Sequence, residues 1–209
     1  MRHSATHALY SYWNELRGNR LAPLRLEIEP HRIGELLLDA FILNQIDSQT
    51  FCFRLAGTRL SARFGSDLRG RNFLDRWRPQ DRSLLQHYLA DVADRGGAAL
   101  FTAEGQPRVS RPVTYEILLL PLIHTGHAVD RFLGSVVPLE HETHGFQRLS
   151  SLALVAAESI NPGEDPLRAR GPALGADSSS PEPLQPNIRN SRLVRQGRRQ
   201  FRVYDGGLS

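Results

Sequence analysis

The feature that most constrains this fold is an apolar run, Ile117 to Ile123, far shorter than the roughly 18 residues that a membrane span needs. Alternate residues of a strand point to opposite faces, and here both alternating sets are apolar. Such a strand is covered on both faces. One face would meet the domain's own helices, and the outer face needs the N-terminal helix or a second subunit. Pro121 is awkward inside the run, because proline removes a ladder donor and usually marks a bulge or an edge.

Two helices are predicted from apolar periodicity. The first is N-terminal and amphipathic and stops at Gly18; its apolar residues recur at i, i+3 and i+4 and are Ala5, Leu9, Tyr12, Trp13 and Leu16. The second runs from Pro79 to about Arg95 and ends at two glycines. Between them, over residues 57–77, glycines and short apolar pairs indicate single helical turns.

Five β-like runs accompany these helices, at residues 40–46, 50–56, 98–103, 113–123 and 132–139. In the second run, Phe51, Phe53 and Leu55 are predicted to share a face opposite Cys52 and Arg54. We predict an α+β fold from this order of elements: two strands, a cluster of short helices, one longer helix and three meandering strands. It is a five-stranded antiparallel sheet with short helices on one face.

The chain divides in composition near residue 161. Residues 1–22 are expected to form the N-terminal helix, as a cap or dimerisation element, 23–147 the domain, and 148–209 a linker and a basic disordered tail. The first 160 residues carry 18 arginines against 17 acids, whereas residues 161–209 carry 8 against 5 and are rich in proline, glycine and serine. Too few apolar groups remain in that tail to offset the entropy of ordering it.

The tail ends in a cluster of arginines interleaved with apolar residues. Four of them are candidate contact residues: Arg195, Arg198, Arg199 and Arg202. Three hypotheses stay open, namely solvated disorder, folding on an acidic protein, and contact with nucleic acid or anionic lipid. The second is favoured over the third, because counterion release needs no Phe201 or Val203. Nucleic acid is therefore the less favoured partner.

The compartment predicted for the chain is the cytoplasm. A single cysteine, Cys52, excludes an intramolecular disulfide, so the chain needs no oxidising compartment to fold. The N-terminal residues lack the apolar core of a signal peptide, and no membrane span is expected.

Several motifs occur in an order that resembles a family of stand-alone PAS proteins of alphaproteobacteria, formerly a domain of unknown function. The resemblance covers about residues 5–140 and rests on the motifs Tyr12-Trp13, Leu16-Arg17-Gly18, Phe53-Arg-Leu-Ala-Gly-Thr58, Phe64-Gly65, Leu68-Arg-Gly70, Phe73-Leu-Asp-Arg-Trp77 and Leu118-Leu-Leu-Pro-Leu122. It implies a sensory or scaffolding module and not an enzyme. PAS domains commonly dimerise through the helix before the first strand, which makes Leu9, Tyr12, Trp13 and Leu16 the candidate dimer-interface residues.

The resemblance also implies a space between helices and sheet that binds a small molecule in some members and is simply core in others. The candidate pocket residues are Arg54, Thr58, Phe73, Trp77 and Tyr88. Each has a structural alternative. Arg54 would face solvent or pair with a carboxylate, Thr58 would cap the turn after Gly57, and the aromatic side chains would seal the core.

No catalytic residue, metal site or cofactor is predicted. Two histidine pairs, His124 with His127 and His141 with His144, lie at opposite ends of one predicted strand, roughly 25 Å apart, which is too far for one ion. No phosphate-binding loop or nucleophile elbow occurs. The sequence therefore predicts a regulatory protein that acts through protein contacts, as a homodimer and with an unknown signalling protein. The alternatives are a small-molecule sensor and nucleic-acid binding through the tail.

Overall fold

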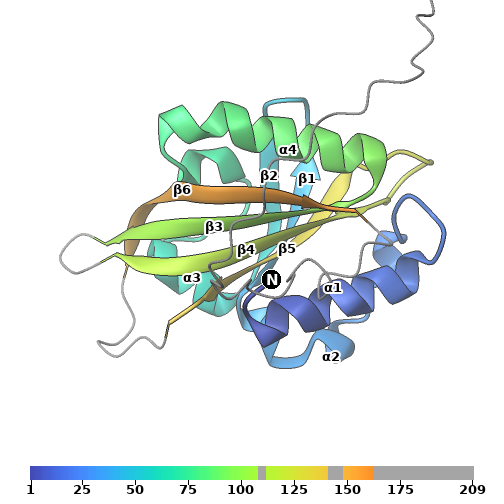
Figure 1. The fold of residues 1–209 in the computed structure, drawn as a ribbon, viewed down its shortest axis with the longest axis horizontal. Helices are drawn as coiled ribbons and strands as arrows, with labels where there is room; N and C mark the ends of the chain where they lie inside the picture. The colour runs from blue at the N-terminus through green and yellow to red at the C-terminus, as the bar shows by residue number, and fades with distance from the viewer. Residues whose placement is uncertain (108–111, 141–147, 162–209) are drawn as a thin grey trace, which may run out of the picture. The chain divides into compact units, whose positions relative to one another are not determined.

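The computed structural model describes residues 1–107, 112–140 and 148–161, and within them a single antiparallel sheet forms the centre of the domain (Figure 1). Its six strands lie in the order β2-β1-β5-β4-β3-β6. They are β1 (Ala40–Gln45), β2 (Phe51–Ala56), β3 (Ala98–Pro107), β4 (Val113–Leu122), β5 (Arg131–Pro138) and β6 (Leu149–Ile160). The antiparallel α+β prediction is confirmed, and the prediction of five strands is wrong.

The sixth strand, β6, lies in a segment that the sequence analysis assigned to the linker. It pairs with β3 along ten residue pairs, from Ala98 opposite Ile160 to Pro107 opposite Leu149. Two register shifts interrupt that pairing, so buried and exposed residues do not alternate strictly along β6. Because the apolar residues of β6 do not recur at every second position, the sequence pattern does not indicate a strand there. From residue 162 onward the chain, including the four tail arginines, lies outside the described residues.

The helices are short except for two, of fourteen residues each. The elements are α1 (Ser4–Arg17), η1 (Arg25–Glu27), α2 (Pro30–Ile33), η2 (Gly34–Leu38), α3 (Thr58–Phe64), η3 (Phe73–Arg76), η4 (Pro79–Asp81) and α4 (Arg82–Arg95). Helix α1 ends where predicted, because Gly18 adopts a positive φ of 57° that an L side chain avoids. No helix among the described residues combines the length and apolar composition of a membrane span.

Two hydrophobic cores lie on opposite faces of the sheet, with α4 on one side and α1 on the other (Figure 1). The inner core joins α3, η3 and α4 to Ile117 and Leu119 of β4. The outer core joins α1 to Leu118, Leu120 and Leu122 of the same strand. The two-faced strand is thus covered as expected, and the chain's own first helix supplies the outer cover.

Pro121 sits in β4 at a point where it removes no bond to β3. The β3–β4 pairing ends at Leu119, while the pairing with β5 continues through Pro121 opposite Phe132. The carbonyl oxygen of Pro121 accepts a hydrogen bond from the indole nitrogen of Trp13, at 2.8 Å. Proline is tolerated there because one neighbour has ended, and its carbonyl anchors α1 to the sheet.

A bulge in β2 changes the predicted faces of that strand. Ile42 of β1 pairs with Leu55, and the next residue, Leu43, pairs with Phe53, so Arg54 is the extra residue. Phe53 is buried as predicted, but Leu55 is 44% exposed and does not share its face. The predicted alternation is wrong at this position, because an inserted residue reverses the side on which the following side chain points.

Candidate functional site: an arginine pocket on the outer face

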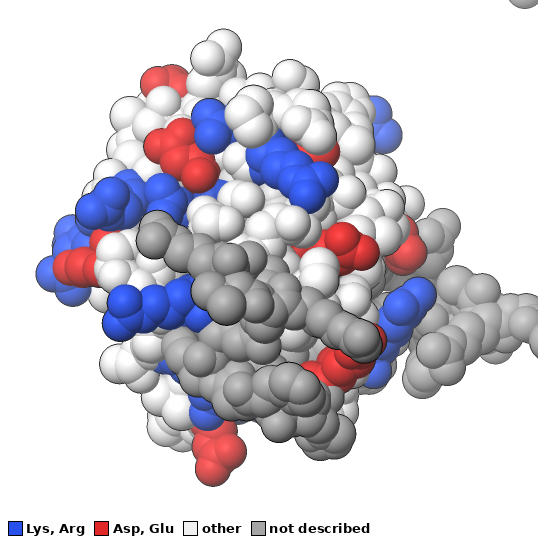
Figure 2. Space-filling model, turned by 90° about the vertical axis from the view of Figure 1, so that its left-hand side faces the viewer, with Lys and Arg blue, Asp and Glu red and all other residues white. Residues whose placement is uncertain are grey.

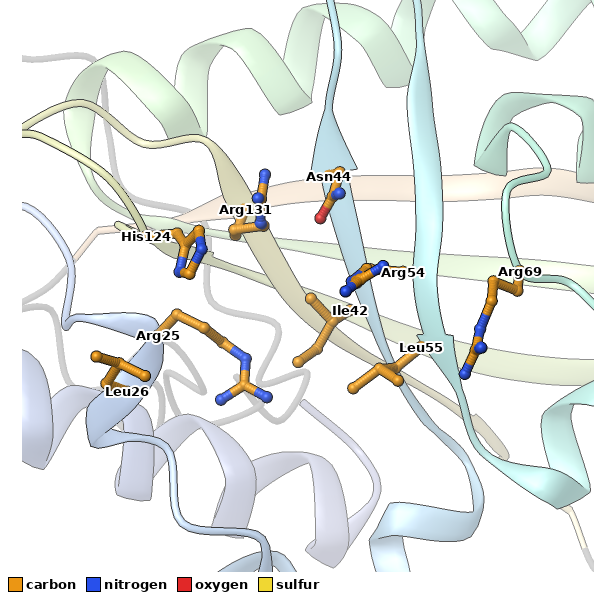
Figure 3. A pocket seen from close by; sticks show the side chains of 9 residues that line it. All are labelled: Arg25, Leu26, Ile42, Asn44, Arg54, Leu55, Arg69, His124 and Arg131. Carbon is orange, nitrogen blue, oxygen red and sulfur yellow. The ribbon is translucent and has the colours of Figure 1, made fainter.

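A pocket of about 440 Å³ opens on the sheet face that carries α1, over β1, β2 and β5 (Figure 3). We call it the arginine pocket. Its lining residues come from η1, β1, β2, the loop after α3, the turn after β4 and the start of β5: Arg25, Leu26, Ile42, Asn44, Arg54, Leu55, Arg69, His124 and Arg131. Volumes of a few hundred cubic ångströms are typical of small-molecule sites.

Arg54 of β2 lies in this pocket beside Leu55, which the bulge brings to the same side of the sheet. Both side chains line the pocket together with Arg25 (Figure 3). Among the described residues, no carboxylate forms an ion pair with Arg54. Of the two structural alternatives for Arg54, exposure to solvent is the one observed. Its exposed side chain lies in the arginine pocket.

Arg25 is positioned by a short 3₁₀ turn fixed to the end of β4. Its backbone N–H donates to the carbonyl of Ile123 at 2.7 Å. Glu27 braces the same turn, because its carboxylate accepts from the N–H of Leu24 at 2.6 Å and pairs with Arg20 at 3.0 Å. The hydrogen bond from Arg20 is the largest cause of a lowered pKa of Glu27, so this brace is charged above mildly acidic pH.

His124 and Arg131 flank the turn between β4 and β5. The N–H of His124 donates to Asp130 at 2.7 Å, which closes the turn, and the guanidinium of Arg131 lies 3.6 Å from the same carboxylate. Asp130 therefore offsets part of the charge of Arg131.

Arg69 comes from the loop between α3 and η3, which runs along the open edge of β2. Gly70 N–H donates to the carbonyl of Phe53 at 2.8 Å, and Phe53 N–H donates to the carbonyl of Arg71 at 3.0 Å. The loop thus protects an edge strand that could otherwise pair with another chain, and it carries Arg69 to the rim of the pocket.

The charge of this pocket is strongly one-sided. Four guanidinium groups line it and no acidic residue does, and among the described residues Arg25, Arg54 and Arg69 have no ion pair. Elsewhere the charges mix: on the face seen in Figure 2, arginine and acidic side chains lie interspersed. A recess lined by one sign of charge concentrates counter-ions, so the arginine pocket attracts anions.

A second recess, of about 170 Å³, adjoins the arginine pocket and is mainly apolar. The two share three lining residues, Arg25, Ile42 and Leu55. The remaining lining of this apolar pocket comes from the segment before β1, from β1 itself, from the end of β2 and from β5: Ile28, Pro30, Ile33, Leu37, Ala40, Phe41, Ala56, Gly57 and Leu133. A charged recess and an apolar recess therefore lie side by side on the outer face.

The predicted pocket residues do not form one site. Phe73, Trp77 and Tyr88 lie on the side of the sheet that carries α4. Arg54 lies on the side that carries α1. Thr58 is the exposed first residue of α3; Gly57 is its N-cap and no side-chain cap is present, so the predicted capping role of Thr58 is wrong. As ligand contacts these five residues stay a prediction.

On the side of the sheet that carries α4, several aromatic rings pack against one another between the helices and the sheet. Ring centroids lie 5.7 Å apart for Phe73 and Trp77, 5.9 Å for Trp77 and Phe101, and 5.6 Å for Phe101 and Tyr88. Phe73, Trp77 and Phe101 are at most 2% exposed. The hydroxyl of Tyr88 donates to the carbonyl of Ala157 in β6 at 3.1 Å. These contacts stack η3, α4 and the sheet into one layer of core.

A buried charged group lies at the edge of this core. Arg63 of α3 is 2% exposed and donates to the hydroxyl of Tyr115 at 3.2 Å, and its guanidinium lies 3.8 Å from Asp39. Arg59 pairs with the same carboxylate. An unpaired charge is costly to bury, so breaking these pairs would destabilise the protein. The pairs therefore hold α3 against Asp39, the residue before β1.

The predicted dimer-interface residues lie on the inner side of α1. Leu9, Tyr12 and Trp13 are buried against the chain's own sheet, and Leu16 is half-buried beside them. In a single chain these side chains are thus already packed, and their role between two copies stays a prediction.

Sequence analysis missed Arg25, Arg69 and Arg131 as site residues. Arg25 and Arg131 belong to no motif, and Arg69, although it lies in the motif Leu68-Arg-Gly70, carries no signal there of a binding role. His124 was interpreted as a solvated turn histidine, and it is exposed in that turn. His141 and His144 lie outside the described residues, within which no group of three or more metal-ligating side chains is close enough to hold an ion.

The fold and the site define a class: a small α+β domain whose sheet is packed by helices on both faces, with a cationic recess on the outer one. The sequence identifies the family within that class, since the model of a PAS domain family matches residues 1–137. The chain belongs to the PAS domain family, which is generally sensory and non-catalytic. No curated protein matches the sequence.

Solved structures of related architecture share little sequence with this chain. The LOV protein of Rhodobacter sphaeroides is 16% identical, with 52% of this chain and 63% of that chain covered, at a TM-score of 0.41. An RNA-binding light-oxygen-voltage receptor is 14% identical (56% and 36% covered, TM-score 0.42), and the PAS domain of an HTR-like protein from Haloarcula marismortui is 22% identical (55% and 94% covered, TM-score 0.38). The chain thus spans less than two thirds of the Rhodobacter protein. At these scores the likenesses carry no functional information.

Proposed function

We propose that this chain is a non-catalytic regulatory PAS protein of the cytoplasm that acts through protein contacts. The observation that carries the proposal is the aromatic interior. Trp77 packs against Phe73 on one side and Phe101 on the other, between the helices and the sheet, where a sensor of this family would hold its ligand. A domain that fills this space with its own side chains transmits signals by what binds its surface.

Homodimerisation is the second part of the proposal. Helix α1 occupies the outer face that a second subunit would otherwise cover, and it joins the rest of the chain through residues 18–24. Exchange of α1 between two copies would keep the contacts of Trp13 and Leu9 unchanged while linking the subunits. Light scattering of the full chain is expected to give twice the 23.5 kDa of one copy. A monomer at high micromolar concentration contradicts this part.

The protein partner is expected to bind in part through the arginine-rich tail. Affinity purification from the native host, with the full chain and with a chain ending at Pro186, tests this directly. A stoichiometric protein retained by the full chain and lost on truncation supports the adaptor role. If neither form retains a stoichiometric protein, the contact mechanism is contradicted.

One observation favours a second candidate, a small-molecule sensor. The indole nitrogen of Trp77 is buried and has no hydrogen-bond partner among the described residues, and a buried donor of this kind calls for an acceptor. A ligand oxygen could supply it. The test is extraction of small molecules from purified wild type and Trp77→Phe protein: a compound present only in wild type supports the sensor, and identical, empty extracts contradict it.

A further inference from the structure

The arginine pocket and the apolar pocket together have the chemistry of a site for an amphipathic molecule. One end offers guanidinium groups without acidic neighbours in its lining, and the other offers the side chains of Ile33, Leu37 and Leu133. Arg25, Ile42 and Leu55 belong to both, so a single molecule can occupy the two ends at once.

The geometry points to an amphipathic anion as the ligand of this outer face: a phosphate or carboxylate head group in the arginine pocket, and a hydrocarbon portion in the apolar pocket. This site lies on the opposite side of the sheet from the space where PAS ligands are expected. It also goes beyond the proposed protein contacts, because it needs no partner protein.

The head-group end suits an oxyanion. Guanidinium groups donate paired N–H groups whose spacing matches the oxygens of phosphate and carboxylate. Arg25 and Arg54 both line the arginine pocket, with Ile42 between them in the view of Figure 3, so the two guanidinium groups are available to one head group. Without an anion these like charges repel one another, and binding one relieves that repulsion.

The apolar end supplies the rest of the affinity. Leu55 is 44% exposed and Leu37 is 38% exposed, and both border the apolar pocket. Covering such side chains with hydrocarbon removes apolar surface from water, and each methylene buried contributes about fourfold in affinity. An inorganic anion would gain none of this.

The β2 bulge contributes to both ends. It brings Leu55 to the outer face beside Arg54, so that the arginine lines the charged recess and the leucine lines both recesses. A regular strand would have buried Leu55 among the inner aromatic side chains. Bulges of this kind often re-aim side chains at binding sites.

Calorimetric titration of the full chain at low salt tests the proposal with four probes: octyl phosphate, octanoate, inorganic phosphate and octanol, all below micelle-forming concentrations. Octyl phosphate or octanoate is expected to bind at least tenfold more tightly than inorganic phosphate and octanol. The stronger of the two identifies the head group as phosphate or carboxylate. Affinity is expected to fall as salt is added, because the arginines are reached by solvent.

Three variants assign the two ends. Arg54→Gln is expected to weaken octyl phosphate about tenfold, and Leu37→Ala to weaken it severalfold while leaving inorganic phosphate unchanged. Arg95→Gln is the control, because Arg95 lies on α4, on the other side of the sheet, and is expected to bind as wild type does. All three positions are exposed or near the surface, so thermal unfolding should stay close to wild type.

Three results would overturn the proposal. One is that no probe binds. Another is that inorganic phosphate binds as tightly as octyl phosphate, which would remove the apolar end. The last is that Arg54→Gln and Arg95→Gln lose affinity equally, which would show nonspecific attraction to a basic protein.

Discussion

Replacing Trp13 tests how strongly α1 is fixed to the sheet. Its side chain is fully buried in the outer core, and its indole N–H donates to Pro121 at 2.8 Å. A buried tryptophan covers roughly 150–250 Å² of surface, and removing it to alanine typically costs about 3–5 kcal/mol. Trp13→Phe keeps most of the ring but leaves the Pro121 carbonyl without its donor, which costs about 1–3 kcal/mol.

Urea unfolding followed by circular dichroism measures both variants. Trp13→Ala is expected to lower the free energy of unfolding by about 3–5 kcal/mol, and the melting temperature by roughly 6–20 °C for a chain of this size. The free energy of unfolding of Trp13→Phe should lie between that of Trp13→Ala and that of wild type. Leu26→Ala is the control, because Leu26 is 82% exposed and such changes stay within about 0.5 kcal/mol. If Trp13→Ala were as stable as the control, α1 would not be packed on the sheet.

Three further predictions concern the sheet and the turn beside the arginine pocket. Gly134→Ala would place its Cβ 2.2 Å from the ring of Phe41 and 2.8 Å from the carbonyl oxygen of Leu118, so we expect a loss of about 1–3 kcal/mol in urea unfolding; stability equal to that of Thr58→Ala, at an exposed position, would contradict this packing. A chain ending at Arg148 lacks β6 and should melt well below one ending at Asn161, which keeps it; equal melting temperatures would show that β6 adds nothing to the sheet. Glu27 has a pKa lowered in the folded state, so its stabilising effect is present above its unfolded pKa of about 4.3 and is lost as pH falls through the folded value. In an NMR titration Arg20→Gln should raise that pKa toward 4.3, and an unchanged pKa would contradict the role of Arg20.

The parts of the fold that follow a regular period were predictable from the sequence. The amphipathic pattern of α1 and its stop at Gly18 are local signals, and a β4 strand that is apolar on both faces requires cover on both. Irregular pairing was not predictable. Leu55 and the whole of β6 were misjudged because bulges break the alternation on which strand prediction depends.

The arginine pocket was out of reach for a different reason. Its residues belong to η1, β1, β2, the loop before η3, the turn after β4 and the start of β5, and only the strand order brings them together. Arg54 was predicted to lie on the face opposite Phe53, and it does, but its neighbours there depend on β1 lying between β2 and β5. A sequence rich in arginine gives no means of choosing among 26 of them.

The central claim is that the chain's own aromatic side chains fill the space between its helices and its sheet. The most direct test is a crystal structure of the full chain purified from its native host. The account predicts Trp77 packed against Phe73 and Phe101, with ring centroids close to 5.7 and 5.9 Å and only protein density between η3, α4 and the sheet. Density for a bound molecule that separates these rings would contradict it.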